Sequence, residues 1–229
     1  MLLEQPVTTN HEPFPNDLDY VLAEIAWVQA RCKRIDVEGR LREVEEDAKP
    51  HPRTVGTREP PLAKEYRRRL PALREAENTL RTTIDARVAG NRMDGPLLAI
   101  DEMGDEHALT DLERTILLLA CLPTLGRDFS DSLNHVSSLG FAGGSLCVEA
   151  VWGFMQMTGT ERIKSRAVFM PTAPLLFNGL ITMTIYGYGN NAFPSSLPGA
   201  TVDITSKAFA QLLGLPEMAL AVKDDDKNG

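Results

Sequence analysis

Apolar residues recur at steps of three and four along two long segments in the first half of the chain. The first segment predicts a helix from Leu18 to about Lys33, with Asp17 placed to cap it. The second predicts a longer helix from Leu62 to Val88. The two stripes consist of Leu18, Val21, Leu22, Ile25, Val28 and Cys32, and of Leu62, Tyr66, Leu70, Leu73, Ala76, Leu80, Ile84 and Val88. Because each stripe lies on one helix face, we expect an antiparallel, coiled-coil-like hairpin.

Proline and charge mark the edges of this hairpin, which we expect to span residues 17–96. Residues 1–16 carry prolines and no periodicity, which indicates a disordered leader. Residues 47–61 are rich in proline and predict a mobile linker, while residues 37–48 can extend the first helix. Pro71 interrupts the second stripe, so it either kinks the long helix or starts a second one.

The second half of the chain predicts shorter elements. Thr110 and Glu113 form a capping-box pattern, which predicts a helix from Asp111 to about Leu122. Further helices are expected at 128–139, at 146–157 behind a Ser145 cap, and at 160–169. Residues 180–186 then alternate with a period of two, and residues 200–204 can form a return strand. The last helix starts at a Thr205 or Ser206 cap and ends at Gly214.

This order of helices, strand, turn-rich loop, strand and helix is typical of a winged helix with a two-stranded wing. The predicted fold is therefore mainly α with a small β wing. It consists of a helical hairpin followed by a winged-helix domain at residues 97–215, with a polar tail at 216–229.

Charge and cysteine usage narrow the partners. The net charge is −8, which argues against a general nucleic-acid or acidic-membrane binder, although a local basic patch remains compatible with it. Three scattered cysteines, Cys32, Cys121 and Cys147, show no metal-ligand spacing and favour a reduced, cytoplasmic chain. The sequence has no run of about 18 apolar residues, so we expect no membrane span.

Three patterns suggest chemistry, and each has a simpler explanation. Gly153 to Thr160 resembles a Walker phosphate loop, but the spacing is too long and no lysine follows, so ordinary helix termination is the better interpretation. Cys147 begins a predicted helix, but no histidine follows it to act as a base. The acids at 101, 102, 105 and 106 lack a calcium-hand spacing and predict a solvated loop. We therefore expect no catalytic, cofactor or metal residues.

The predicted helix 146–157 would be the one to enter a DNA groove, and it carries no lysine or arginine. Its apolar side chains suggest a buried or partner-facing helix, and a modest basic cluster follows it. The candidate partner-binding residues are Val148, Val151, Trp152, Met155, Arg162, Lys164 and Arg166. The stripe of helix 62–88 is a second candidate contact surface.

Four stretches together resemble the N-terminal half of a group of bacterial AAA-type ATPases, some of them similar to those associated with contractile injection systems. The stretches are Leu18 to Trp27 (LDYVLAEIAW), Leu109 to Ala120 (LTDLERTILLLA), Phe169 to Leu176 (FMPTAPLL) and Val202 to Gly214 (VDITSKAFAQLLG). In that group a helical region and a winged-helix domain precede a Walker-containing motor. The chain departs from the pattern by lacking Walker A, Walker B and an arginine finger, and by its glycines at 140–144.

The resemblance implies a non-catalytic adaptor that recognises a substrate, a protein partner or a neighbouring subunit. ATP and Mg²⁺ would belong to a downstream motor domain, and no functional residue is carried over to this chain. The chain would be either a fragment or a standalone relative without the motor. The alternatives are a winged-helix DNA-binding regulator and, more weakly, a cysteine hydrolase using Cys147.

Overall fold

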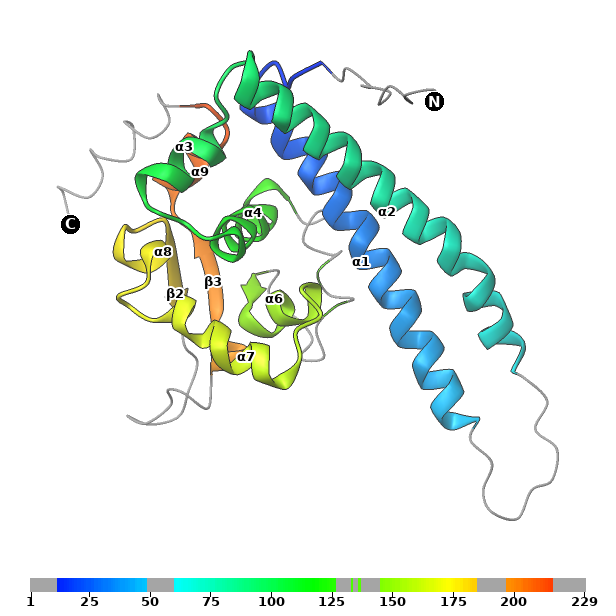
Figure 1. The fold of residues 1–229 in the computed structure, drawn as a ribbon. Coiled ribbons are helices and arrows are strands. Elements are labelled where there is room, and N and C mark those ends of the chain that lie inside the picture. The colour runs from blue at the N-terminus through cyan, green and yellow to red at the C-terminus, as the bar shows by residue number, and fades with distance from the viewer. Residues whose placement is uncertain are drawn as a thin grey trace, which may run out of the picture.

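The structure is a computed structural model that describes residues 12–48, 60–126, 133, 136, 145–184 and 197–215. Two long helices stand beside a compact group of short helices and strands (Figure 1). The elements are α1 (Asp17–Asp47), α2 (Pro61–Met93), α3 (Ala99–Glu106), α4 (Asp111–Leu125), β1 (Leu146–Cys147), α6 (Val148–Phe154), α7 (Gly159–Ser165), η2 (Arg166–Phe169), α8 (Pro174–Phe177), β2 (Ile181–Thr184), η3 (Leu197–Gly199), β3 (Thr201–Ile204) and α9 (Ser206–Leu212). This confirms the mainly helical prediction with a small β wing.

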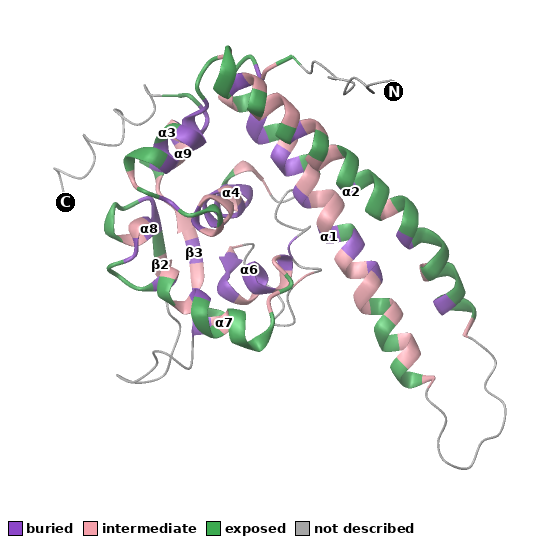
Figure 2. Cartoon of the chain, in the orientation of Figure 1, coloured by how far each residue is buried: buried purple, intermediate pink, exposed green. Residues whose placement is uncertain are grey.

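Helices α1 and α2 form the predicted antiparallel hairpin, and their inner sides are the buried ones (Figure 2). The start of α1 corrects one expectation, because Asn16 rather than Asp17 caps the helix. The Asn16 Oδ1 atom accepts a hydrogen bond from the Asp19 amide at 2.9 Å. Asp17 Oδ1 instead accepts from the amide of Ala99 at 2.7 Å, which ties the hairpin to α3.

Both hairpin helices are longer than the apolar stripes indicated. Helix α1 continues to Asp47, and α2 passes through Pro71 without ending. Pro71 therefore does not start a second helix. Pro71 is exposed, so water can reach the carbonyl group that lacks its helical amide partner. Most of the expected linker, residues 49–59, lies outside the described residues.

The chain ahead of α1 is held against α2 by a buried asparagine. Asn91 accepts a hydrogen bond from the Phe14 amide at 2.8 Å and donates one to the Phe14 carbonyl at 2.9 Å. The Phe14 ring is fully buried, and the guanidinium of Arg87 lies 3.9 Å from its centroid. Residues 12–16 therefore belong to the fold and not to a disordered leader, whereas residues 1–11 lie outside the described residues.

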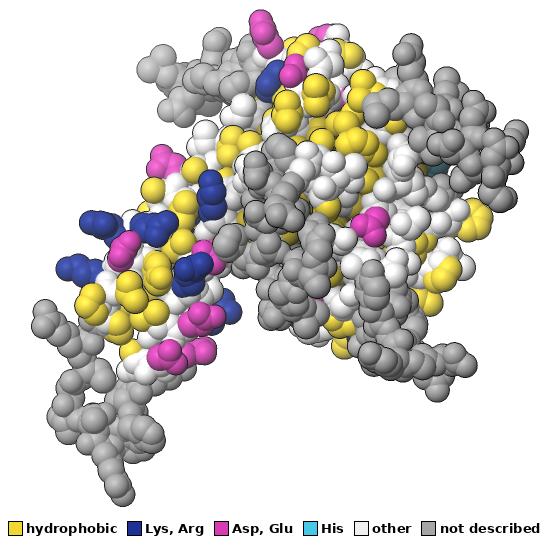
Figure 3. All heavy atoms as spheres, turned by 180° about the vertical axis from the view of Figure 1, so that it is seen from behind, with side chains coloured by type: hydrophobic (Ala, Val, Ile, Leu, Met, Phe, Trp, Pro, Cys, Tyr) yellow, Lys and Arg dark blue, Asp and Glu magenta, His cyan; other side chains and the backbone are white. Residues whose placement is uncertain are grey.

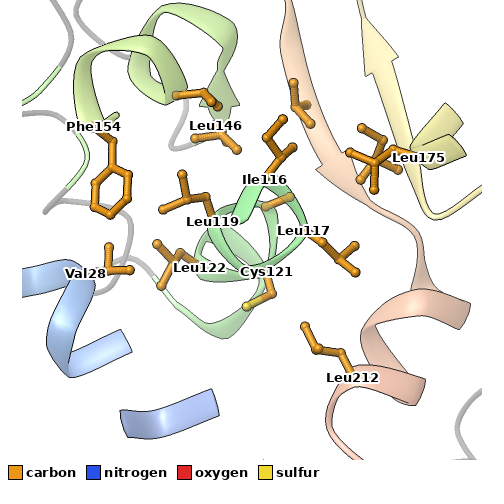
Figure 4. Packing of buried hydrophobic residues seen from close by; sticks show 14 of the residues in the cluster. Val28, Ile116, Leu117, Leu119, Cys121, Leu122, Leu146, Phe154, Leu175 and Leu212 are labelled. Carbon is orange, nitrogen blue, oxygen red and sulfur yellow. The ribbon is translucent and has the colours of Figure 1, made fainter. Parts of the chain in front are cut away.

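Helix α4 lies at the centre of the core. The capping box predicted at Thr110 and Glu113 is present, with the Thr110 amide donating to Glu113 Oε2 at 2.9 Å. The helix runs through Pro123 to Leu125, three residues beyond the predicted end. Its side chains point toward α1, α6, the sheet and α9 (Figure 4). The cluster includes Val28, Ile116, Leu117, Leu119, Cys121, Leu122, Leu146, Phe154, Leu175 and Leu212.

The sheet has three antiparallel strands in the order β1-β3-β2. Strands β2 and β3 confirm the two predicted wing strands, with Ile181 opposite Ile204. The third strand, β1, lies where a helix was predicted. Leu146 pairs with Val202, and Cys147 pairs with Thr201. Ser145 therefore caps nothing, and helix 146–157 is reduced to α6, with Cys147 as its N-cap. The predicted helix at 128–139 and most of the wing loop lie outside the described residues.

The acidic stretch before α4 also differs from its prediction. It forms the helix α3 rather than a solvated loop, and Asp101 is buried within it. Arg92 donates to both carboxylate oxygens of Asp101, at 3.0 and 2.6 Å, and Arg114 donates a third hydrogen bond at 2.8 Å. Burial of Asp101 is tolerated because these arginines neutralise its charge.

Candidate functional site

The candidate site is built on the pair of helices α6 and α7 and the turn between them. Strand β1 comes directly before α6, so α6 is the first helix of a helix-turn-helix and α7 is the second. In DNA-binding proteins with this motif, the second helix lies in the major groove. In a DNA complex of this kind, α7 rather than residues 146–157 would take the groove-facing position.

Most of the apolar residues predicted to contact a partner lie in the core. Val148 and Val151 are fully buried, and Trp152 is 3% exposed. The Trp152 Nε1 atom donates to the Ser165 hydroxyl at 2.8 Å, which fixes α6 against α7. Met155 is half-buried at the end of α6. The side chains of Val148, Val151 and Trp152 therefore position α7 and are not available to a partner.

The basic residues that follow lie on α7 and at its end. Arg162 is held in place because its Nη1 atom donates to Glu149 Oε1 at 3.0 Å and its Nε atom donates to the Met157 carbonyl at 3.2 Å. Lys164 is exposed, and Arg166 is partly exposed. All three basic side chains therefore reach solvent, but the Arg162 side chain, 37% exposed, is already engaged by Glu149.

The first turn of α7 is fixed by a second capping box. The Thr158 amide and hydroxyl both donate to Glu161 Oε2, each at 2.7 Å. These hydrogen bonds favour the ionised form, with the bond from the Thr158 amide contributing most, and they lower the pKa of Glu161. The exposed side of α7 therefore carries an acid as well as Lys164.

Large apolar side chains are exposed on α7 and on the two short elements that follow it. Ile163 is 70% exposed, Phe177 is 76% exposed and Met170 is 39% exposed. Helix α7 packs on η2, and η2 packs on α8, so the three residues lie along consecutive elements. We call Ile163, Lys164, Met170 and Phe177 together the α7–α8 surface.

The turn between α6 and α7 is tied to the hairpin by a network that we call the turn joint. Arg31 donates from Nε to the Phe154 carbonyl at 3.0 Å, and Arg34 donates from Nη2 to Gln156 Oε1 at 3.3 Å. Both guanidinium groups also bond to Glu77 on α2, which is 6% exposed. Gln156 has a φ of 51°, a strained value for a residue other than glycine.

The charges of the turn joint support one another. Burial opposes the charged form of Arg34, but the hydrogen bonds and the negative charge of Glu77, together with Glu38, outweigh it and raise the pKa of Arg34. Sequence patterns did not identify this network. Arg31 and Arg34 lie next to the buried apolar stripe of α1, which could have suggested that they are partly buried. The sequence did not indicate that Glu77, on the other helix, is their partner.

The other sequence candidates take structural positions. Cys147 is 7% exposed, and its sulfur accepts a hydrogen bond from the Ala150 amide at 3.4 Å. Gly153 lies within α6 and Gly159 begins α7, so the Walker-like stretch is not one loop. Among the described residues, no cluster of histidine, cysteine and acidic side chains is suited to a metal ion. None of the described helices combines the length and apolarity needed to cross a bilayer.

Comparison with protein-family models gives a match over nearly the whole chain. The matching model is described as "Winged helix domain, variant" and covers residues 3–222, so it includes the hairpin as well as the wing. Searches of curated proteins and of solved structures found no match.

Proposed function

We propose that this chain, which belongs to the winged helix domain, variant family, is a non-catalytic recognition module, the N-terminal adaptor region of an AAA-type ATPase. In this proposal the α7–α8 surface binds a protein partner or a neighbouring subunit. ATP and Mg²⁺ are bound by a motor domain outside this sequence, and the protein works in the cytoplasm. The link to AAA-type ATPases rests on the four sequence stretches that resemble that group.

The observation that carries the proposal is the exposure of Ile163 and Phe177. Both side chains are more than two thirds exposed in a region where a DNA reader needs cations. Exposed apolar residues that lie together commonly mark protein interfaces, and a residue such as Phe177 can fill a pocket on a partner. The single charges of Glu161 and Lys164 beside them suit the polar rim of such an interface.

Site-directed photocrosslinking tests the proposal. A photoreactive residue is placed at Ile163 in one variant and at Met93 in a control, because Met93 is 79% exposed but lies at the end of α2. We expect a specific cross-linked protein from position 163 that is lost when Phe177 is changed to Asp. Mass spectrometry then shows whether the captured protein, or the remainder of the same polypeptide, carries an ATPase motor. Equal capture from positions 163 and 93 would contradict the proposal.

DNA binding is the second candidate, because α7 follows α6 as the second helix of a helix-turn-helix would, and it carries Lys164 with Arg166 at its end. Fluorescence anisotropy with a random duplex at low salt distinguishes the two functions. A DNA-binding regulator would bind in a salt-dependent manner, and Lys164→Gln would weaken binding and flatten the salt dependence. The adaptor proposal expects no binding, and it expects Lys164→Gln to affect partner capture less than Ile163→Asp.

A further inference from the structure

A cleft lies between the hairpin and the winged-helix core, away from the α7–α8 surface. Side chains from α1, α2, α3 and α4 enclose a volume of about 600 Å³, and we call it the junction cleft. Volumes of roughly 300–1,000 Å³ are usual for sites that hold small organic molecules. The four helices around it are visible in the upper part of Figure 1.

The floor of the junction cleft is apolar and the wall is charged. We call the apolar lining residues the floor, and they are Val28, Val88, Ala89, Ile100, Leu118 and Leu119, together with Trp27. The wall contains the three arginines Arg81, Arg92 and Arg114 and the two buried carboxylates Glu24 and Asp101. A molecule that fits this cleft therefore needs an apolar part and a polar part that the wall can recognise.

Hydrogen-bond partners already occupy both buried carboxylates. Arg81 donates to both oxygens of Glu24, at 3.0 and 3.1 Å, and Tyr20 supplies a further hydrogen bond. Burial, and after it the charge of Glu24, raises the pKa of Tyr20, so its hydroxyl stays protonated and donates. Asp101 accepts two hydrogen bonds from Arg92 and one from Arg114.

Donor groups remain on the arginines after these contacts. Arg92 bonds through Nε and Nη2, and its Nη1 group has no hydrogen-bond partner among the described residues. A guanidinium carries five N–H donors, so the two donors on Nη1 are available to a ligand. Because these donors are left on Arg92, this part of the wall can bind a molecule that accepts hydrogen bonds.

The charge of the wall around Arg92 agrees with such a ligand. Over the whole lining three guanidinium groups face four carboxylates, but at the end of the wall that holds Arg92, this residue and Arg114 share the single buried carboxylate of Asp101. Of the two other lining acids, Asp85 is paired with Arg81 at 2.8 Å and Asp111 is exposed. The Arg92 side chain is itself 57% exposed, so solvent screens its charge as well as the charges of these aspartates.

We propose that the junction cleft binds a small organic anion, a carboxylate or a phosphate monoester attached to an apolar group. The anionic group contacts Arg92, and the apolar group lies on the floor beside Leu118. Because Arg92 is on α2 and the floor includes α4, the ligand joins the hairpin to the winged-helix core. The same chemistry is available from a free metabolite and from the acidic terminus of a peptide.

Calorimetric titration with matched probes tests this proposal. Benzoate and phenyl phosphate carry the expected groups, while benzyl alcohol is a neutral match and benzamidine is a cationic one. Arg92→Gln removes the available donors and leaves Asp101 paired with Arg114. Arg74→Gln makes the same change on the same helix at a residue outside the cleft, whose side chain is 60% exposed.

We expect saturable binding of at least one anion by the wild-type chain and by Arg74→Gln, weakened at least tenfold in Arg92→Gln. Ala89→Phe provides a second test, because it fills the cleft from an exposed position and removes no charge. It should weaken binding to a similar extent. The proposal fails if neither anion saturates at about 10 mM, if benzyl alcohol or benzamidine binds as tightly, or if both variants bind like the wild type.

A short peptide ending in phenylalanine, tested with a free and with an amidated terminus, distinguishes the two sources. Displacement of phenyl phosphate by the free acid alone identifies a peptide terminus as the occupant. Binding of phenyl phosphate or benzoate without competition from the peptide identifies a free anion.

Discussion

Replacing Glu77 by glutamine tests whether the turn joint stabilises the protein. Glu77 is 6% exposed and accepts hydrogen bonds from Arg31 at 2.9 Å and from two nitrogens of Arg34. Removal of one partner from a buried ion pair costs about 3–5 kcal/mol. Arg34 keeps its bond to Glu38, and the Arg31 side chain is 21% exposed, so we expect a loss of about 3 kcal/mol in the free energy of unfolding.

The matched control is Glu45→Gln on the same hairpin. Glu45 pairs with Arg67, but the two side chains are 41% and 53% exposed, and such pairs contribute about 0–1 kcal/mol. Lysine, arginine and acidic side chains alternate on this outer part of the hairpin (Figure 3). Urea unfolding, monitored by circular dichroism, measures the stability of both variants. The comparison requires that the slope of the unfolding free energy against urea concentration is the same as in the wild type. Equal losses in the two variants, or a loss below about 1 kcal/mol for Glu77→Gln, would refute the reasoning.

Three further predictions concern stability. Gly153→Ala should lower the free energy of unfolding by about 1–3 kcal/mol, because the new Cβ atom would collide with the carbonyl oxygen of Val136. Gly159→Ala is the control, because a Cβ atom there meets open space and should be neutral or stabilising. Thermal unfolding compares the two variants. Thr110→Ala removes a capping box and should cost about 1 kcal/mol, while the replacement of half-buried Thr115, which caps no helix, by alanine should cost less, as urea titration will show. Burial raises the pKa of Cys32 and of Cys121 to about 12, so the unfolded chain loses these protons first as the pH rises. Stability should therefore fall between about pH 9 and pH 12, and changing both cysteines to alanine should flatten that dependence; an unchanged slope would contradict it.

Sequence patterns correctly predicted the elements that are stabilised by residues close to one another in the sequence. The α1 stripe places Val21, Val28 and Cys32 in the core, as its spacing indicated. The capping box at Thr110 formed because both of its partners lie within four residues. The alternation at Ile181 likewise gave a strand with its expected partner, β3.

Elements that depend on distant partners were missed. Leu146 is apolar and compatible with either a helix or a strand, and pairing with Val202, far along the chain, decides in favour of the strand. Asp101 was expected in solvent because the arginines that neutralise it lie on two other helices. Ile163 and Phe177 lie in elements too short to show a periodic stripe, so their exposure followed only from the fold.

The continuity of α1 has a mechanical consequence. About 13 residues of unbroken helix separate Arg34 in the turn joint from the last residue, Asp47, which corresponds to roughly 20 Å. A tilt of about 20° around the joint therefore moves the outer end through about 7 Å, since a rigid helix transmits rotation over its whole length. Atoms in contact are about 4 Å apart. A movement of about 7 Å at the outer end is larger than this distance, so a small rotation at the turn joint can form or break an interface there.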